Sequence, residues 1–378
     1  MRRSIMYWAA GAQVTGREDA EVEPEAIMAT EAVALPAVSV VVLGYNGREH
    51  VSACLASLRD QDFERPYEVL FVDNGSEDGS ADLAETFAEV RVQRLGKNYG
   101  YCQGNNLGAD LARARLLVFL NQDVVVHRSW LGELMAAVES DPSIAAGHCN
   151  VIHPWNPEFA RQERVQPVLA AYTPDLSPLG FVEYRRVSVE EGTVDTLFLS
   201  GVSLILKRDV VPEIGGYIFD PDMFLYGEDM DLGLRIRSAG YRTVAATRSV
   251  LYHSHTLADQ LSLRSFLKTL GIIRNRLLAL WKCSYWSEFL PLAAITLLGA
   301  PFNSSQFGLP LQKKLLYFFF LLPPTAAAAL AAVAVMPRYA GRRRQVLAGR
   351  RAGRGWLLRA LLFDRKRMGE TGVGGRHG

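Results

Sequence analysis

Residues 38–45 read VSVVVLGY, a nearly unbroken run of β-branched and aliphatic side chains. Such a run is typical of a strand that is buried on both faces of a parallel sheet. The Asn46-Gly47 pair then ends the strand, and apolar side chains recur at helical spacing from Val51 to Leu58. The stretch therefore predicts a strand followed by a helix that crosses back over the sheet.

The same cycle of strand and helix repeats further along the chain. This alternation predicts an α/β fold with a doubly wound, mostly parallel sheet. The predicted strands cover residues 67–73, 90–95, 116–123, 196–208 and 243–252, and the predicted helices run from Ser80 to Phe87, from Asn105 to Ala114 and from Glu228 to Gly240.

Changes in composition divide the chain into four parts. Residues 1–36 carry no clear pattern and are expected to be a flexible N-terminal extension, whereas residues 37–260 hold the α/β domain. Inside that domain, the proline-rich residues 148–196 are expected to form loops and a hairpin. Residues 261–336 are apolar and helical in pattern, and residues 337–378 form a basic C-terminal tail.

The composition excludes several classes of protein. The chain has 378 residues, of which 49% are hydrophobic and 21% charged, and its net charge of +1 argues against a nucleic-acid binder. Twelve basic and only two acidic residues lie between Pro337 and Gly378, so the basic charge is concentrated in the tail. The four cysteines are far apart in sequence, which argues against a zinc site or a disulfide framework and favours a reducing compartment.

Polar side chains follow three of the predicted strands directly. Tyr45 follows the first strand, Asp73 and Asn74 follow the second, and Gln122 and Asp123 follow the fourth. Ligands of open α/β sheets bind at the carboxyl ends of the strands, so we expect a ligand site at this edge. No G-x-G-x-x-G follows the first strand and no G-x-x-x-x-G-K is present, which argues against a dinucleotide cofactor and a P-loop.

Individual residues of this edge suit particular contacts. The carboxylate of Asp73 can accept hydrogen bonds from a nucleobase or a ribose. Asp123 suits a divalent cation, Mg²⁺ or Mn²⁺, that bridges phosphates, although a helix cap is the ordinary role of such an aspartate. The glycine-rich loop that includes Gly100 and Asn105 allows the backbone to approach a phosphate or a sugar, which by itself is a weak signal.

A cluster of carboxylates opens the predicted helix at 228–240. Glu228, Asp229 and Asp231 lie in its first turn, where acids are common because the helix dipole favours them. Three carboxylates in four positions exceed what a cap requires, so one of them is a candidate general base. His253 follows a strand-like stretch and is either structural or a metal ligand.

The order of these motifs resembles the family 2 glycosyltransferases, and most closely their bacterial rhamnosyltransferase-type branch. The resemblance covers residues 38–255, more than half of the chain. It is carried by VSVVVLGYNG, FVDNGSEDGS, NYGYCQGNN, FLNQD, SGVSLILKR, FLYGEDMDLGLRIRSAGY and YHSH, in that order.

This resemblance implies a GT-A type fold and an inverting transfer of sugar from a nucleoside-diphosphate sugar. It implies that Tyr45, Asp73, Asn74, Gly100, Asn105 and Gln122 lie at the donor. Asp123 and His253 correspond to residues near the metal and the diphosphate. Asp229 corresponds to the family's catalytic base, with Glu228 beside it.

Two departures from common family patterns refine this expectation. The acidic motif often reads Asp-x-Asp, but here it is Asn121-Gln122-Asp123, which leaves one carboxylate and puts strict metal dependence in doubt. The Gln-x-x-Arg-Trp motif of processive synthases is absent, which favours the addition of one sugar. The resemblance favours dTDP-rhamnose as donor, with a UDP-hexose next.

Two other classes of function are weighed against this one. A nucleotidyltransferase that forms sugar nucleotides would be expected to carry a basic glycine-rich loop after the first strand, where this chain has Gly44-Tyr45-Asn46-Gly47. A non-catalytic nucleotide-sugar-binding protein would not need the full set of Asp73, Asp123, Glu228 and Asp229. Both remain alternatives to the transferase.

The apolar residues after the α/β domain suggest contact with a membrane. Residues 315–336 would span about 33 Å as a helix at ~1.5 Å per residue, but Pro323-Pro324 is expected to interrupt it. Nucleotide sugars are cytosolic, and the arginines of residues 338–351 also favour that side. We therefore expect in-plane or re-entrant helices on the cytoplasmic face, held by apolar burial and anionic lipid, near a lipid-linked glycan acceptor. A buried helical subdomain is the alternative.

Overall fold

The computed structural model describes residues 35–152, 171–176, 182–254, 263–300 and 311–362. The expected N-terminal extension lies almost wholly outside these ranges, as does the end of the basic tail. The strand and helix boundaries given below are those of the described residues.

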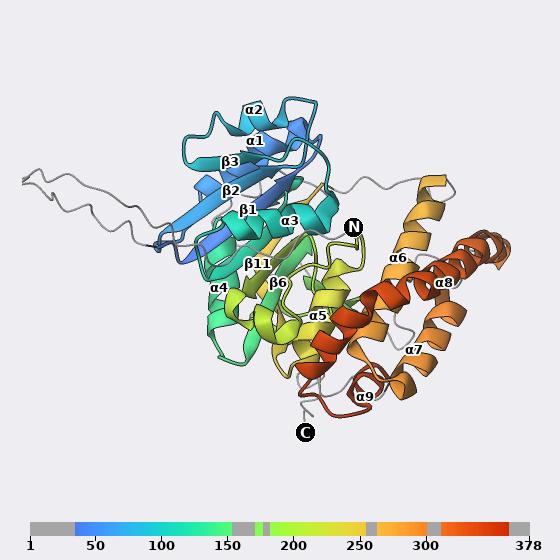
Figure 1. Ribbon diagram of the computed structural model, residues 1–378. Coiled ribbons are helices and arrows are strands. Elements are labelled where there is room, and N and C mark those ends of the chain that lie inside the picture. The colour runs from blue at the N-terminus through green and yellow to red at the C-terminus, as the bar shows by residue number, and fades with distance from the viewer. Residues whose placement is uncertain (1–34, 153–170, 177–181, 255–262, 301–310, 363–378) are drawn as a thin grey trace, which may run out of the picture. The chain divides into compact units, whose positions relative to one another are not determined.

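The main sheet has the strand order β3-β2-β1-β4-β10-β6-β11-β5, and β9 pairs with β11 (Figure 1). The part from β3 to β4 is parallel, whereas β10 runs antiparallel to both β4 and β6. The predicted α/β fold is confirmed, and the sheet is parallel in this first part and mixed beyond it. Its strands are β1 (Val38–Gly44), β2 (Tyr67–Asp73), β3 (Val90–Arg94), β4 (Leu116–Asn121), β5 (Val124–Val126), β6 (Ile144–Ile152), β9 (Thr193–Asp195), β10 (Ser203–Lys207) and β11 (Arg242–His253).

The segment between β5 and β10 is more regular than its prolines suggest. A two-stranded antiparallel hairpin, β7 (Ala171–Leu176) and β8 (Val182–Val187), is present as expected, and the 3₁₀ turn η2 (Val189–Glu191) follows it. The expectation that residues 148–196 form only loops and a hairpin is wrong at their start, because β6 continues to Ile152 in parallel pairing with β11. Its sequence, IAAGHCNVI, mixes small and polar residues, so pairing with neighbouring strands rather than β-propensity holds it in the sheet.

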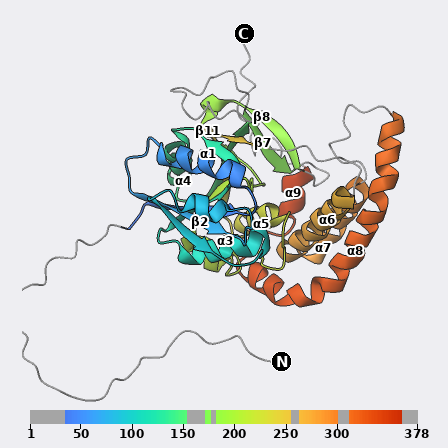
Figure 2. The same ribbon diagram turned by 90° about the horizontal axis from the view of Figure 1, so that it is seen from above.

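Helices cover both faces of the sheet. The alternation within β1 shows the layering, since Val38, Val40 and Val42 pack with α1, α2 and α4 while Val41 packs on the opposite face with α3, α5 and α6 (Figure 2). These side chains are all fully buried. The helices that flank the sheet are α1 (Arg48–Arg59), α2 (Ser80–Ala84), α3 (Gly100–Leu111), α4 (Trp130–Glu139) and α5 (Glu228–Ser238), and the 3₁₀ segment η3 (Arg208–Ile214) follows β10.

Among the described residues, four helices follow the sheet: α6 (Leu263–Cys283), α7 (Trp286–Gly299), α8 (Leu311–Ala348) and α9 (Trp356–Leu362). The expectation that Pro323-Pro324 interrupts α8 is wrong, because the helix continues through both prolines and through Pro337. Packing against α6 compensates for the backbone bonds that proline removes, and the Thr325 hydroxyl donates to the Leu321 carbonyl at 2.7 Å. The basic tail expected from residue 337 therefore begins inside a helix.

Helix α8 contains the described segment with the composition of a membrane span. Residues 319–348 form 30 residues whose most apolar part has a mean hydropathy of 2.0, and 33% of that part is buried inside the protein. A core helix of a soluble protein can have the same composition, so length and hydropathy alone do not decide between the two.

Several arginines after residue 337 contact the protein itself. Arg342 pairs with Asp220 and Asp222 at 2.5 and 2.7 Å, and Arg343 donates to the Trp281 carbonyl. Arg350 pairs with Glu288 at 2.8 Å, and both of these side chains are 1% exposed. Part of the basic charge is therefore neutralised within the fold.

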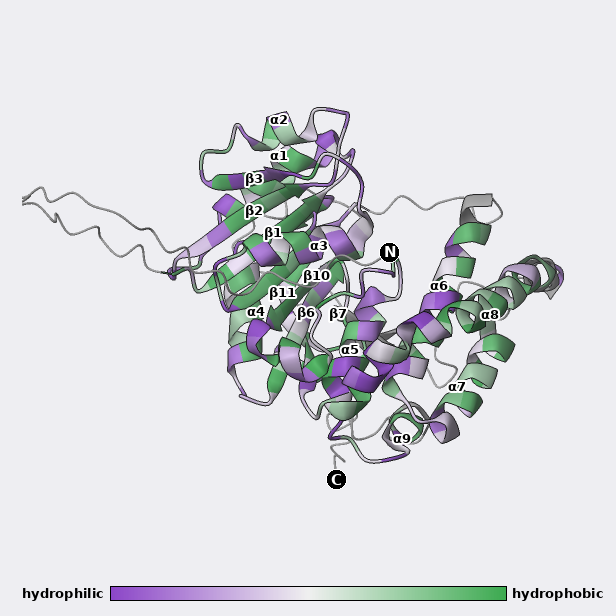
Figure 3. Cartoon of the chain, in the orientation of Figure 1, coloured by the Kyte–Doolittle hydropathy of each residue, from purple (hydrophilic) through white to green (hydrophobic). Residues whose placement is uncertain are grey.

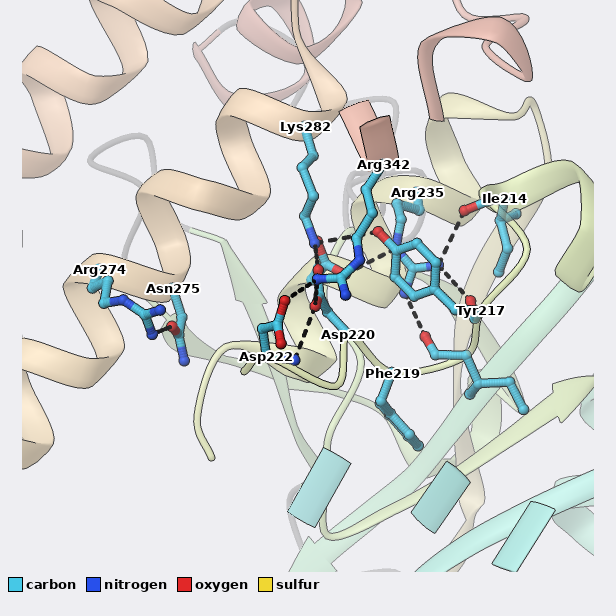
Figure 4. Close-up of polar contacts among 12 residues, drawn as sticks. Ile214, Tyr217, Phe219, Asp220, Asp222, Arg235, Arg274, Asn275, Lys282 and Arg342 are labelled. Atoms are coloured by element: carbon cyan, nitrogen blue, oxygen red, sulfur yellow. Dashed lines mark hydrogen bonds and ion pairs between the residues drawn. The ribbon is translucent and has the colours of Figure 1, made fainter. Parts of the chain in front are cut away.

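A buried ionic cluster joins α5 to α6 (Figure 4). It consists of Asp220, Asp231, Arg235 and Lys282, whose side chains are all 0% exposed. Lys282 Nζ lies 2.6 Å from Asp220 Oδ2 and 2.7 Å from Asp231 Oδ1, while Arg235 Nε donates to Asp231 Oδ2 at 2.8 Å. Arg342 adds a contact from α8, so the cluster fixes α5 against two C-terminal helices.

The ionic cluster predicts that substitution of Lys282 costs much more stability than substitution of the exposed Arg351. Lys282→Met leaves two buried carboxylates without their shared cation, so it should lower the free energy of unfolding by about 3–5 kcal/mol. Arg351→Ala removes an ion pair to Glu213 whose arginine is 64% exposed, and it should cost at most about 1 kcal/mol. Chemical denaturation of both variants tests this, and equal losses would contradict the role of the cluster.

Candidate active site

The strands β1, β2 and β4 end at one edge of the sheet. Gly44 lies opposite Asp73 in the parallel register, and Leu43 lies opposite Asn121. The polar residues that follow these strands therefore emerge together, as the sequence predicts. Asp73 is 3% exposed, and its carboxylate accepts hydrogen bonds from the Ser76 amide at 3.1 and 3.3 Å.

Tyr45 and Gln122 meet at this edge. Tyr45 is 45% exposed, and Gln122 Nε2 donates to its carbonyl at 2.9 Å. The buried Oε1 of Gln122 accepts no hydrogen bond from the described residues. A Cβ at Gly47 would lie 2.2 Å from Gln122 Nε2, so a larger residue there would displace the Gln122 amide from this position.

Two of the predicted donor-binding residues, Asn74 and Asn105, form side-chain hydrogen bonds within the protein. Asn74 is 2% exposed, donates to Asn98 Oδ1 and the Gly100 carbonyl at 3.1 and 3.2 Å, and accepts from the Tyr99 amide at 2.9 Å. Asn105 is 1% exposed inside α3 and donates to the Tyr101 carbonyl at 3.0 Å. Both side chains are buried and bonded to the protein itself, and their role at the donor stays a prediction.

Gly100 brings the start of α3 against the loop that precedes α5. Its φ is +78°, and a Cβ there would lie 2.6 Å from atoms of Phe224. The next amide, that of Tyr101, donates to the Phe224 carbonyl at 2.9 Å. The glycine-rich loop therefore packs against the loop that leads into α5, the helix that carries the acidic pair.

Asp123 and His253 come together from distant parts of the chain. Asp123 Oδ2 lies 3.2 Å from His253 Nε2, because β5 and β11 pair antiparallel with Val124 opposite His253. The Asp123 side chain is 32% exposed and that of His253 is 11% exposed. No group of three or more acidic, histidine or cysteine side chains that could hold a metal occurs in the described ranges. Any cation here would take two protein ligands and complete its shell elsewhere.

Glu228 is buried and Asp229 half-buried at the first turn of α5, beside the turn at Gly201. A Cβ at Gly201 would lie 3.4 Å from Glu228 Oε1 and 3.5 Å from Asp229 Oδ2. Gly201 also accepts a hydrogen bond from the Tyr101 hydroxyl at 2.7 Å, and the adjacent Val202 carbonyl accepts from the Asn121 amide at 3.0 Å. The acidic pair therefore adjoins the end of β4, close in sequence to Asp123.

Burial separates the acidities of the three carboxylates of α5. It raises the pKa of Glu228 to about 8, helped by the charge of Asp229, and it raises the pKa of Asp229 to about 6. Backbone hydrogen bonds from Met230 and Gly201 and the charge of Arg276 oppose the shift at Asp229. Burial acts in the same direction on Asp231, but the charges of Lys282 and Arg235 outweigh it and lower that pKa. Asp231 is therefore structural, and the perturbed pair is the candidate for chemistry.

Comparison with known proteins identifies the domain that supplies the strand edge of the site. The family described as "Glycosyl transferase family 2" matches residues 39–211, the region that supplies the edge of the sheet. The chain carries a glycosyl transferase family 2 domain. The family expected from the order of motifs is confirmed.

Relatives of this family 2 domain act in different organisms. Glycosyltransferase AglE of Haloferax volcanii is 24% identical over 55% of this chain and 63% of its own length. An N-acetylglucosaminyl-diphospho-decaprenol L-rhamnosyltransferase of Mycobacterium tuberculosis is 29% identical over 57% of this chain and 75% of its own length. This chain therefore spans less than two thirds of AglE.

A solved structure shares the fold. The crystal structure of GalNAc-T7 with UDP, GalNAc and Mn²⁺ superposes with a TM-score of 0.53 over 81% of this chain and 58% of that chain. At 16% identity this likeness concerns the fold alone, and it agrees with the GT-A type predicted from the sequence.

Two residues that border the acidic pair were not predicted as part of the site. Tyr101 lies in a motif that was assigned to the donor loop, yet its hydroxyl contacts the Gly201 turn. Arg276 lies in α6, within the region interpreted as membrane-associated, and is 4% exposed beside Asp229. The polar residues of RNR (274–276) inside an apolar helix were the available signal for a buried polar contact.

The raised pKa of Glu228 predicts how stability depends on pH. In the unfolded chain this carboxyl ionises near its ordinary pKa of 4.5, whereas in the fold it holds its proton up to about 8. The folded state binds more protons in that window, so this group lowers the free energy of unfolding as the pH rises. Glu228→Gln should therefore gain stability over wild type by up to about 1.4 kcal/mol per pH unit from about pH 5 to 8.

Urea denaturation across this pH range measures the difference in the free energy of unfolding between Glu228→Gln and wild type. Glu64→Gln, a substitution at an exposed glutamate, is the matched control and should keep a constant offset from wild type. If the Glu228→Gln offset were equally constant, the carboxyl would not be held protonated by burial.

Proposed function

We propose that the protein is an inverting glycosyltransferase that moves one sugar from a nucleoside-diphosphate sugar to a hydroxyl of a lipid-linked cell-envelope glycan. The observation that carries the proposal is the pair of buried Glu228 and half-buried Asp229 beside the Gly201 turn, within a structure that contains a family 2 domain. dTDP-rhamnose is the favoured donor and a UDP-hexose the next. The rhamnosyltransferase activity named for the Mycobacterium tuberculosis relative supports this choice.

The acidic pair suits a proton transfer at neutral pH. With a pKa of about 6, Asp229 is ionised, and with a pKa of about 8, Glu228 keeps its proton and can donate a hydrogen bond. Asp229 takes the proton of the acceptor hydroxyl, whose oxygen attacks C1 of the donor sugar. The bond from C1 to the phosphate oxygen breaks, its electron pair leaves with the nucleoside diphosphate, and the configuration at C1 inverts.

The donor would bind along the edge formed by β1, β2 and β4. The half-exposed ring of Tyr45 offers a surface for a nucleobase, and Asp73 offers a carboxylate at the end of β2. Gln122 holds the Tyr45 loop in place and has a free acceptor oxygen within the described structure. Gly100 would act through the packing of its loop against Phe224.

A divalent cation, Mg²⁺ or Mn²⁺, fits the Asp123–His253 pair. A partly exposed carboxylate and an imidazole nitrogen 3.2 Å apart are a donor set that such ions accept, with phosphate oxygens and water in the remaining positions. When bound, the ion would offset the charge of the departing diphosphate. Asp123 and His253 would hold it, and the presence of one carboxylate rather than two limits the affinity.

The proposed base and the proposed cation ligand predict different defects. Asp229→Asn should keep donor binding and lower kcat by about 10²-fold or more, because an amide cannot accept the proton. Asp123→Ala should weaken donor binding together with the response to Mn²⁺. Saturation-transfer NMR with uridine, thymidine and guanosine sugars, followed by transfer assays, measures both. Near-native turnover by Asp229→Asn would exclude it as the base.

The exposed face of α7 and α8 supports a location at the cytoplasmic face of the membrane. Figure 3 shows hydrophobic residues along both helices. Arg338 and Arg344 remain exposed near the end of α8, while Arg342 ties that end to the catalytic domain. Both helices would then lie in the plane of the interface. The large apolar side chains exposed there are Trp286, Leu290, Leu298, Phe319, Leu322, Leu330 and Val333.

Vesicle binding tests this location. The full chain should sediment with vesicles of mixed neutral and anionic lipid, because the apolar face and the exposed arginines both favour the interface. Leu298→Glu with Leu330→Glu, at positions that are 73% and 75% exposed, should release it without unfolding. A full chain that stays soluble without detergent and ignores the vesicles at low salt would contradict the proposal.

A further inference from the structure

A cavity of about 180 Å³ lies between the first turn of α5 and the side of α6. Its walls include Phe198, Tyr226, Glu228, Asp229, Ile272 and Arg276. We infer that this cavity is the acceptor subsite and that it receives a single sugar ring, with Arg276 as the residue that positions Asp229. The inference rests on the proposed function, and it makes α6, which lies beyond the matched family domain, a wall of the active site.

Helix α6 shapes this cavity by holding a strained turn. Tyr226 has a φ of +69°, which is rare for an aromatic residue, and Gly227 follows with +86°. Asn275 of α6 donates from Nδ2 to the carbonyls of Leu225 and Tyr226 at 3.2 and 2.7 Å. Such strain persists only where neighbours enforce it, and here the neighbour is the residue next to Arg276.

Asp229 meets charged and polar groups from each element packed around it. Glu228 lies beside it on α5, Tyr101 reaches the Gly201 turn from α3, and Arg276 comes from α6. Arg276 is 4% exposed, and burial lowers its pKa to about 10 while the charge of Asp229 opposes that shift. Both side chains line the same cavity, and a buried cation there favours the ionised form of the base.

The chemistry of the walls suits a sugar. Phe198, Tyr226 and Ile272 offer apolar surface for the C–H face of a ring, whereas Glu228, Asp229 and Arg276 offer partners for hydroxyls. The volume is below the roughly 300–1,000 Å³ of sites for drug-sized ligands, which favours one ring over an oligosaccharide. A hydroxyl of a ring in this cavity would lie next to the proposed base.

Filling the cavity tests the subsite. Ile272→Trp should abolish binding of octyl β-D-glucoside and octyl N-acetyl-β-D-glucosaminide in NMR titrations, and lower transfer to them at least tenfold, with unchanged donor binding. Leu267→Trp is the matched control, since this position of α6 is 57% exposed, and it should behave as wild type. Absent binding of both glycosides to wild type, or equal binding by the two variants, would overturn the inference.

Substitution of Arg276 tests its positioning role. Arg276→Met should lower kcat at least tenfold and move the acid limb of the pH–rate profile upward, because Asp229 loses its neighbouring cation. Arg276→Lys should restore part of kcat and part of the position of the acid limb. If the arginine were only structural, Arg276→Met would leave the acid limb in place. If wild type bound no nucleotide sugar at all, the proposed function itself would fail, which is a separate result.

Discussion

The structure around the candidate site depends on one buried interaction, the pairing of Lys282 with Asp220 and Asp231. Four side chains with no exposed surface carry two positive and two negative charges there, so each desolvated charge has an opposite partner. Arg235 also donates to the carbonyls of Ile214 and Tyr217 at 3.1 and 2.9 Å, and its guanidinium lies 4.1 Å from the Tyr217 ring. The cluster thereby fixes the loop after η3, helix α5 and helix α6 as one unit.

This arrangement explains why neighbouring carboxylates in one turn of α5 have different roles. Asp231 points into the cluster and is neutralised by two cations, whereas Glu228 and Asp229 face Gly201 and the cavity. A buried carboxylate with less compensation keeps a raised pKa.

Much of the fold and the edge of the sheet could be predicted because the determining patterns are local. Continuous apolar runs mark β1, β2 and β4, and the polar residues after them meet once the strands are parallel. The resemblance to the family placed Asp123 and His253 near the same metal and diphosphate, and the structure brings their side chains to 3.2 Å. The prediction of the sheet edge needs only the period of the side chains and the known edge where ligands bind.

The features that could not be predicted depend on contacts between distant segments. The residues around Asn74 in sequence do not show that its amide donates hydrogen bonds to Asn98 and to the Gly100 carbonyl. The apolar pattern of α6 is compatible both with a membrane helix and with a wall of the site. The sequence alone does not show which groups Arg276 and Lys282 contact, because those groups come from distant segments. The arginines after residue 337 were interpreted as free charge, yet Arg342 and Arg350 are paired inside the fold.

We conclude that α5 and α6 form one cooperative unit, and native-state hydrogen exchange of the full chain tests this most directly. We predict that the amides of Asp231–Ser238 and of Asn275–Cys283 open with the same free energy and the same dependence on denaturant. An α6 that opens at clearly lower free energy, while α5 stays protected, would contradict the claim that the buried lysine joins them.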